Sequence, residues 1–174
     1  MENIEIRESL PEDLPSIETL YSDAFPDEDL LPLVKELLQE RTDVLSLVAI
    51  KDNAPVGHII MTYCSVPGYQ DKLALLGPLA VSTNCQRQGI GSAITHRALG
   101  ILGSFHVTNV YVLGDPAYYG RLGFSPQETV EPPYPLPKEW AGAWQVISLN
   151  ETSSSPKGKL SVPLPWRKPE LWAP

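Results

Sequence analysis

The chain has 174 residues, of which 43% are hydrophobic, so it is long enough for a single domain with a sizeable core. Its formal net charge is −8, and residues 1–45 hold 13 acids against three bases, which disfavours nucleic acid as a partner. The sequence has no long apolar run, no basic-then-apolar leader and only two cysteines, so we expect no membrane span, no disulfide or zinc framework and a cytoplasmic location.

The first part of the chain is predicted to supply one strand, two helices and a hairpin. Ser9 is predicted to cap the first helix, and Asp52–Asn53 to form the tight turn of the hairpin. The acidic helix pair could attract a cationic amine, or it could be a solvated surface that only aids solubility. The predicted elements are a strand at 3–7, helices at 9–21 and 30–40, and hairpin strands at 44–51 and 55–63.

The stretch 73–103 is the most informative part of the sequence. Residues 73–81 form a nearly unbroken apolar run, which is typical of a strand that is buried on both faces. Residues 82–88 are a polar turn, and residues 89–102 have apolar side chains at helical spacing. Pro78 lacks an N–H group, so we expect a bulge or a break in strand pairing beside it.

The turn before this helix is predicted to bind a pyrophosphate. Gly89 and Gly91 let the backbone approach a ligand, the first N–H groups of the helix point outward, and Arg87 adds a positive charge. A P-loop would need a lysine after its glycines, and a dinucleotide fold would need G-x-G-x-x-G directly after the strand with an acid about 20 residues on. Neither spacing is present, while a glycine-rich turn that binds nothing stays open.

The remaining elements include a strand at 106–113 and a short helix at 117–121. Asp115 is predicted to cap that helix, with Pro116 at its first position. The tail, 126–174, holds ten of the 18 prolines. In it we predict a strand at 143–149 beside the previous one, a polar loop at 150–158, a short strand at 159–164, and Trp166 and Trp172 pinning the end of the chain onto the body.

Together these features resemble the GNAT family of acyltransferases, which hold acetyl-CoA with the signature Q/R-x-x-G-x-G/A. The resemblance covers the order of elements over a core of residues 1–125, and the Pro-rich extension 126–174 resembles a bacterial subgroup. It implies an α/β fold (an α+β mixed sheet with helices on both faces) whose two central parallel strands are splayed to admit the pantetheine arm. The matching residues imply a cofactor-binding set of Leu79, Ala80, Val81, Gln86, Arg87, Gln88, Gly89, Ile90, Gly91 and Ser92.

A second GNAT motif, Y-x-x-x-G-F, matches Tyr119 to Phe124. The resemblance assigns to Tyr119 the role of proton donor to the departing CoA thiolate, for which a phenol of pKa about 10 is competent at pH 7. A packed core aromatic is the alternative for Tyr119, and Tyr118 takes the catalytic place if the register is off by one.

The sequence departs from the family in two places. Asp115–Pro116 stand where many members have an Asn, and the strand 106–113 lacks the Glu that serves some members as base. The candidates for the base that deprotonates the acceptor amine are then a water chain or an acid within 27–29. His58 and His96 are predicted to be structural, His106 is a further alternative by pKa, Cys85 is not expected to act as a nucleophile, and Cys64 is expected to be core or strand-end.

We therefore predict one GNAT-like domain over 1–174, an acyl-CoA-dependent N-acyltransferase that acts by direct attack of a bound amine. Acetyl-CoA is the expected co-substrate, no metal is expected, and the acceptor is an amine-bearing small molecule or a protein amino group. A homodimer is allowed for. A non-catalytic acyl-CoA-binding sensor or scaffold and a nucleotide-binding module are the alternatives.

Overall fold

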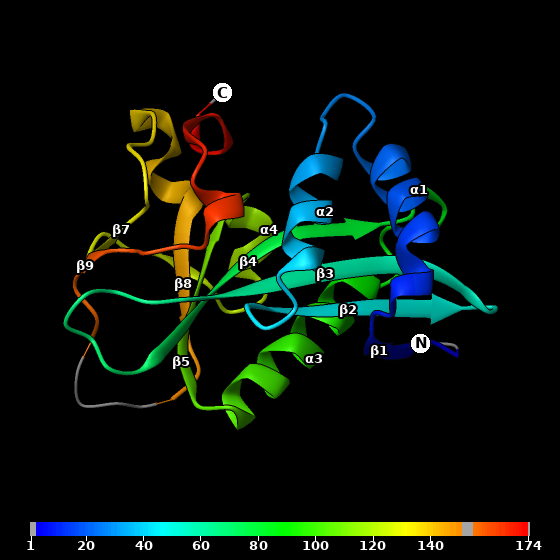
Figure 1. The fold of residues 1–174 in the computed structure, drawn as a ribbon, viewed down its shortest axis with the longest axis horizontal. Coiled ribbons are helices and arrows are strands. Elements are labelled where there is room, and N and C mark those ends of the chain that lie inside the picture. The colour runs from blue at the N-terminus through cyan, green and yellow to red at the C-terminus, as the bar shows by residue number, and fades with distance from the viewer. Residues whose placement is uncertain (1–2, 151–154, 174) are drawn as a thin grey trace. The chain divides into compact units, whose positions relative to one another are not determined.

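The computed structural model describes residues 3–150 and 155–173, which form a seven-stranded mixed sheet in the order β1-β2-β3-β4-β5-β8-β6 and a small sheet of β7 and β9 (Figure 1). The predicted α/β class with a mixed sheet is thus confirmed. The elements are β1 (Glu5–Glu8), α1 (Leu14–Ala24), α2 (Leu31–Gln39), β2 (Val44–Lys51), β3 (Ala54–Cys64), β4 (Lys72–Val81), α3 (Ile90–Ser104), β5 (Val107–Leu113), α4 (Pro116–Gly120), β6 (Ser125–Pro126), β7 (Val130–Glu131), β8 (Trp144–Ser148) and β9 (Gly158–Lys159).

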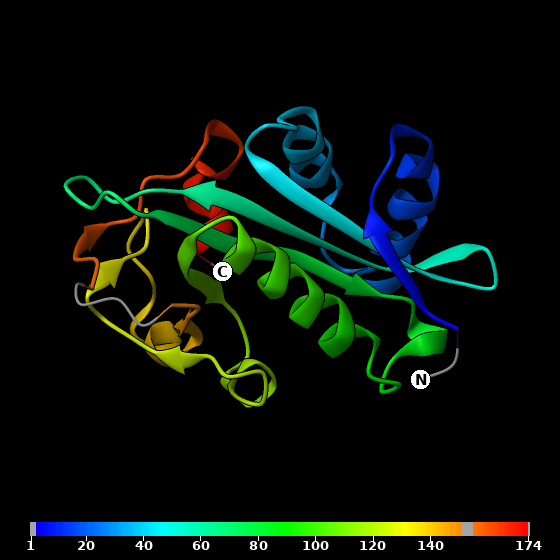
Figure 2. The same cartoon turned by 90° about the horizontal axis from the view of Figure 1, so that it is seen from below.

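The backbone divides into two compact units, which are described separately. The first unit comprises Met1–Met61 and Gly77–Gly100, and the second comprises Thr62–Leu76 and Ile101–Pro174. In the first unit, α1 and α2 cover one face of the strands and α3 covers the other (Figure 2). The turn between β2 and β3 has positive φ at Asp52 (50°) and Asn53 (64°), as a tight two-residue hairpin requires, and this part of the prediction is confirmed.

The entry to α1 differs from the prediction. Ser9 does not cap the helix, because the residue directly before the first turn is Leu10, and the Ser9 hydroxyl donates to Ser46 Oγ at 2.6 Å. Asp13 closes the turn that leads into α1: its carboxylate accepts the Leu10 N–H at 2.7 Å and two hydrogen bonds from Arg7 at 2.8 and 3.1 Å. A short 3-10 turn, Pro11–Asp13, then leads into the helix.

The pairing of β4 with β5 stops part-way along β4. Residues from Lys72 to Leu76 pair in parallel with residues from Val107 to Val112, and the register ends at Leu76 opposite Val112. β4 itself continues to Val81 through the cis Gly77–Pro78 peptide. The break that Pro78 predicts in this ladder is therefore confirmed.

In the second unit, β8 lies antiparallel to β5, as predicted, and β6 pairs with the outer side of β8. Trp144 stacks on Tyr111 with ring centroids 5.7 Å apart, and Trp172 meets Trp144 edge-on at the same separation. Trp166 and Trp172 are buried, and their indole N–H groups donate to Thr62 Oγ1 (3.0 Å) and to the Trp166 carbonyl (3.1 Å). Both tryptophans thus hold the C-terminal segment within this unit.

Two predictions for the tail are only partly met. The strand expected at 159–164 is shorter, since β9 covers Gly158–Lys159 and is followed by a single bridge from Ser161 to Ser65. The polar loop expected at 150–158 lies partly outside the described residues.

Candidate active site

The turn from β4 to α3 is anchored on both sides within the first unit. The Ser82 N–H donates to the Val56 carbonyl of β3 at 2.8 Å. The next residue, Thr83, donates its N–H and its hydroxyl to the Asp23 carboxylate of α1 at 2.8 and 2.9 Å, and the backbone hydrogen bond is the main reason that the pKa of Asp23 is lowered. The turn is thus tied to the end of α1, which sequence periodicity could not reveal.

The backbone of this turn is bent where the sequence places its glycine motif. Arg87 has φ of 65° and Gly89 has φ of 84°, so two residues near the helix start are in the left-handed region. The Ala93 N–H makes a helical hydrogen bond to the Gly89 carbonyl at 2.9 Å. The N–H groups of the residues between them, Ile90 to Ser92, have no intrahelical partner because they open the helix. These groups form a cradle that suits an anion.

The side chains of the turn divide into those that brace it and those that face solvent. Gln86 is used internally, since its Nε2 donates to the Val81 carbonyl at 3.1 Å. Gln88 Oε1 accepts from Lys51 Nζ at 3.3 Å, and Arg87 is exposed. Lys51 therefore brings a second positive charge to the turn from the end of β2. The sequence analysis missed Lys51 because 37 residues separate it from Gln88.

The start of α3 packs closely on the neighbouring strands. A Cβ at Gly57 of β3 would lie 3.1 Å from Ile90 Cγ2 and 3.6 Å from the Ala80 carbonyl oxygen, so this glycine lets the helix start approach the sheet. Ala80 is buried, whereas Leu79 and Val81 are half-buried. All ten predicted cofactor-binding residues thus lie along one segment, which runs from the end of β4 through the turn to the first residues of α3.

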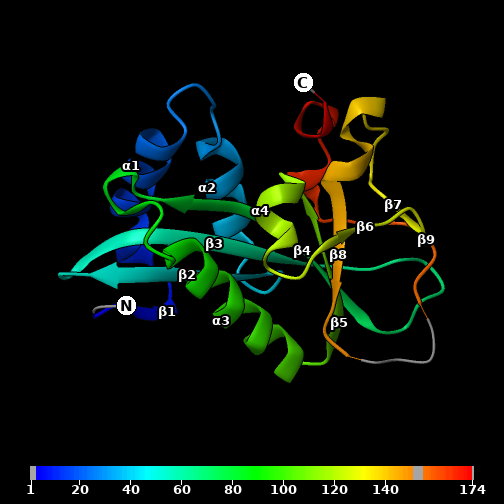
Figure 3. The same ribbon diagram turned by 180° about the vertical axis from the view of Figure 1, so that it is seen from behind.

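Tyr119 lies on α4 in the second unit, and Figure 3 labels this helix. The predicted cap is confirmed, since Asp115 Oδ1 accepts the Ala117 N–H at 3.0 Å. The Tyr119 ring is held edge-on by Tyr118 and Phe124, with centroids 4.9 and 5.7 Å away. Burial is the main reason that the pKa of Tyr119 is raised above its ordinary value, and the electrostatic effect of the neighbouring Tyr118 is a second, smaller reason. Its hydroxyl makes no hydrogen bond to any residue that the structure describes, so it is free to donate to a ligand.

His58, one of the histidine alternatives for a base, is occupied by structural contacts. His58 is fully buried and both ring nitrogens are occupied, Nδ1 by the Tyr21 hydroxyl and Nε2 by Ser46 Oγ, each at 2.8 Å. Burial lowers the pKa of His58 to about 3, which keeps it neutral. His96 and His106 are exposed. The structural interpretation of His58 is thus the one that its contacts favour.

A separate cavity in the first unit, of about 500 Å³, lies between α1, α2 and the start of β2. It is lined by Leu10, Leu14, Leu38 and Ser46, among others, and by none of the predicted cofactor-binding residues. No helix within residues 3–150 and 155–173 is long and apolar enough to cross a membrane.

Comparison with known proteins decides the family. The model of the acetyltransferase (GNAT) family matches residues 14–124. The chain belongs to the GNAT acetyltransferase family.

Two relatives in Escherichia coli K12 support this membership. The chain is 34% identical to the uncharacterized N-acetyltransferase YjhQ over 67% of its length and 68% of that protein. It is 32% identical to YhbS, also an uncharacterized N-acetyltransferase, over 68% and 72% of the two chains.

Solved GNAT structures have the same fold. YhbS in complex with CoA superposes with a TM-score of 0.83 and 26% identity, covering 95% of this chain and 92% of that one. A GNAT acetyltransferase from Brucella melitensis in complex with acetyl-CoA, at 24% identity, has the same fold with a TM-score of 0.75 over 95% and 99% of the two chains. These findings confirm the predicted family, the GNAT fold and the enzyme class, an acyl-CoA-dependent N-acyltransferase.

Proposed function

We propose that this enzyme transfers the acetyl group of acetyl-CoA to an amino group of its acceptor by direct attack of the amine on the thioester. The observation that carries the proposal is the turn between β4 and α3, where a glycine-bent backbone, a helix start and two cationic side chains meet. CoA bound to YhbS, a relative with the same fold, supports acetyl-CoA as the co-substrate.

In this proposal the cradle from Gln86 to Ser92 binds the CoA pyrophosphate. The N–H groups of Ile90, Gly91 and Ser92 donate to its oxygens, and the helix dipole favours its charge. Arg87 and Lys51 add positive charge at the same turn. The backbone of Leu79 to Val81 lies past the end of the β4–β5 ladder, and in this proposal it pairs with the pantetheine arm.

Tyr119 is proposed as the proton donor to the leaving group. The amine nitrogen attacks the acetyl carbon, the C–S bond breaks, and the thiolate takes the hydroxyl proton of Tyr119. The proton lost from the attacking nitrogen leaves to solvent, and Tyr119 regains a proton from solvent. The raised pKa keeps the phenol protonated before each turnover, and its free hydroxyl speaks against the non-catalytic sensor.

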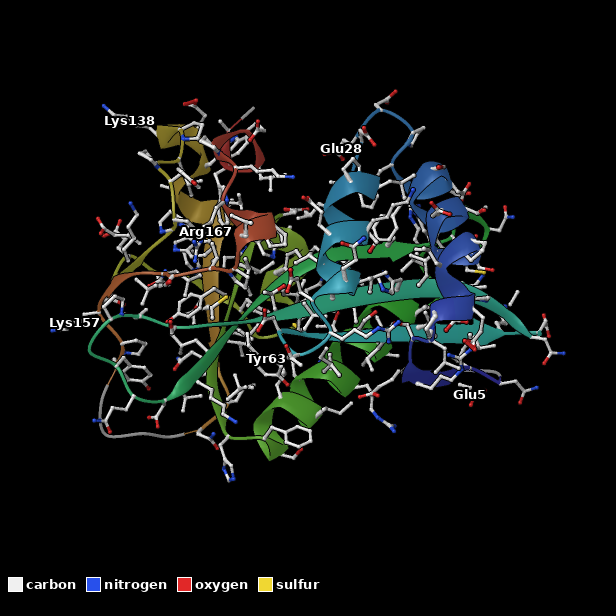
Figure 4. The ribbon with its side chains drawn as sticks, viewed as in Figure 1. Glu5, Glu28, Tyr63, Lys138, Lys157 and Arg167 are labelled. Carbon is white, nitrogen blue, oxygen red and sulfur yellow. The ribbon has the colours of Figure 1, made fainter. Side chains whose placement is uncertain are left out.

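The acceptor is proposed to be a cationic amine that approaches the acidic N-terminal helix pair. The loop between α1 and α2 carries three exposed acids, Asp27, Glu28 and Asp29, of which Glu28 is labelled in Figure 4. β5 contains no acid, so the amine loses its proton to solvent, either directly or by way of the acids of this loop. Attraction of a cation to these acids predicts that its apparent affinity weakens with added salt.

An amine panel tests the proposal. Spermidine, lysine methyl ester, tyramine and glutamate are each mixed with acetyl-CoA, and the released thiol and the acetylated amine are measured together. We expect at least one cationic amine to give both products in equal amounts, with an apparent affinity that falls with salt. Tight binding of acetyl-CoA with no acetylated amine from a wide panel would favour the acyl-CoA sensor, and a reaction limited to neutral or anionic amines would remove the cationic acceptor.

The cellular location and the oligomeric state of the enzyme are also proposed. The two cysteines, Cys64 and Cys85, are unpaired, which suits the reducing cytoplasm where we place the enzyme. A homodimer stays a prediction that sedimentation at several concentrations would test.

A further inference from the structure

The ring of Tyr119 rests directly on Gly114, the residue that follows β5. A Cβ built on Gly114 would come within 3.0 Å of two carbons of this ring, and it would lie 2.9 Å from Cδ2. Real Cβ atoms essentially never come so close to another heavy atom. Gly114 is not among the residues with positive φ, so its backbone would accept alanine. It is the ring, and not the backbone conformation, that requires glycine here.

The backbone of Gly114 is held by Ala143, which directly precedes β8, and by Gln145 of β8. Its N–H donates to the Ala143 carbonyl at 2.9 Å, and its carbonyl accepts Nε2 of Gln145 at 3.1 Å. Gln145 has no exposed surface and also donates to the Ala143 carbonyl at 3.4 Å. Both amide protons of Gln145 therefore go to carbonyls at this turn.

Gln145 makes these contacts at an energetic cost. Its Oε1 has no hydrogen-bond partner among the described residues, although it is fully buried. A buried acceptor without a partner is destabilising, so a hydrophobic residue would suit this position better if packing alone mattered. The amide is explained by what its nitrogen holds, which is the carbonyl of Gly114.

We propose that Gly114 and Gln145 are positioning residues that set the Tyr119 hydroxyl for proton donation. The inference rests on the proposed function, in which Tyr119 protonates the thiolate. Gly114 supplies the flat surface on which the ring lies, and Gln145 fixes that surface by holding its carbonyl. Misplacing a catalytic group by about 1 Å can lower the rate on the order of 10²-fold. The contacts that fix the Tyr119 ring can therefore affect the rate without contacting the substrate themselves.

The chain offers a matched control for the key variant. Gly114→Ala adds a methyl group against the ring, whereas Gly120→Ala adds one directly after Tyr119, where nothing lies within 4 Å. We expect Gly114→Ala to lower kcat by roughly 10- to 100-fold with the acetyl-CoA KM unchanged, and Gly120→Ala to leave kcat near that of the wild type. The double variant Gly114→Ala/Tyr119→Phe should be no slower than Tyr119→Phe alone. If the kcat losses of the two single variants multiply in the double variant, the proposal is overturned.

A spectroscopic measurement tests the position of the Tyr119 ring independently of the reaction. NMR of protein with ¹³C-labelled tyrosine rings, with Tyr119 assigned through Tyr119→Phe, needs no acceptor. The Tyr119 resonance should shift in Gly114→Ala and in Gln145→Met, which keeps the length of the side chain without its donors, and should stay in place in Gly120→Ala. An unmoved resonance in folded Gly114→Ala overturns the positioning role whatever the activity. A moved resonance with full turnover also overturns the positioning role, and Tyr119→Phe then shows separately whether Tyr119 is the proton donor.

Discussion

Replacement of Tyr119 by Phe removes the proposed proton donor and nothing else that the structure records. The hydroxyl has no hydrogen-bond partner among the described residues, and the ring contacts with Tyr118 and Phe124 are kept. The free energy of unfolding should therefore change by less than about 1 kcal/mol. A loss of activity in this variant then reports chemistry and not folding.

The size of the loss follows from the environment of the phenol. General acid catalysis typically contributes about 10²- to 10⁴-fold. Burial raises the pKa of Tyr119 above its ordinary value of 10.0. An ordinary thiol has a pKa of about 8.5, so Tyr119 is a weaker acid than the thiol that it would protonate. We therefore expect the lower part of that range, about 10²- to 10³-fold in kcat, which corresponds to about 3–4 kcal/mol of activation free energy. Acetyl-CoA affinity should barely change, because the lost interaction forms in the transition state.

The pH profile of the wild type gives an independent check. Because the pKa of Tyr119 lies above its ordinary value of 10.0, the hydroxyl stays protonated up to at least that pH. The rate should rise as the acceptor amine loses its proton and should not fall again below about pH 10.

The assay follows thiol release from acetyl-CoA between pH 6 and pH 10 in wild type, Tyr119→Phe and Tyr118→Phe. Tyr118→Phe should be nearly silent. Full turnover in Tyr119→Phe, or an alkaline fall near pH 8 that this variant abolishes, would refute the reasoning, and a loss only in Tyr118→Phe would shift the register by one residue.

Two further predictions concern stability and the charge at the turn. Hydrogen bonds from Arg7 are the first cause of the lowered pKa of Asp13, so Asp13 stabilises the fold above its unfolded pKa of about 3.8, and this contribution is lost as the pH falls through the lower folded value. Asp13→Asn should lower the free energy of unfolding by about 1–2 kcal/mol at pH 7, measured by urea unfolding, and the difference from wild type should shrink toward pH 3. The same experiment should show one unfolding transition if 1–174 is a single domain. Equal stability of the two proteins at pH 7 would contradict the role of Asp13. Lys51→Gln should weaken CoA binding several-fold and reduce its salt dependence, whereas Lys138→Gln, an exposed control in the second unit, should do neither. Unchanged CoA affinity in Lys51→Gln would remove Lys51 from the site.

The parts of the fold that could be predicted from sequence are those that local patterns determine. The hairpin turn at Asp52–Asn53 and the cap at Asp115 each depend on residues within a few positions. Pro78 predicted the end of the β4–β5 ladder because a proline lacks the N–H that a ladder needs. Gly89, which the sequence analysis places in a turn where the backbone can approach a ligand, has a φ of 84° that favours glycine.

The parts that could not be predicted depend on pairs of residues far apart in the chain. Ser9 has the side chain of a typical cap, but its hydroxyl donates a hydrogen bond to Ser46, 37 residues away. The bond from Thr83 to Asp23 spans 60 residues, and the bond from Gln145 to Gly114 spans 31. Periodicity and short motifs carry no signal for such pairs, so the supports of the site appear only in the folded chain.

Calorimetry with acetyl-CoA, ATP and NAD tests the central claim most directly, because it asks which ligand the turn between β4 and α3 accepts. The wild type should bind acetyl-CoA and should not bind ATP or NAD comparably. Gly89→Asp places bulk and negative charge in the cradle and should weaken acetyl-CoA at least about tenfold, or about 1.4 kcal/mol. Gly100→Asp, on the exposed side of the same helix with nothing within 4 Å, is the matched control and should bind as the wild type does. Unchanged acetyl-CoA affinity in folded Gly89→Asp, or tighter binding of ATP or NAD by the wild type, would contradict the account.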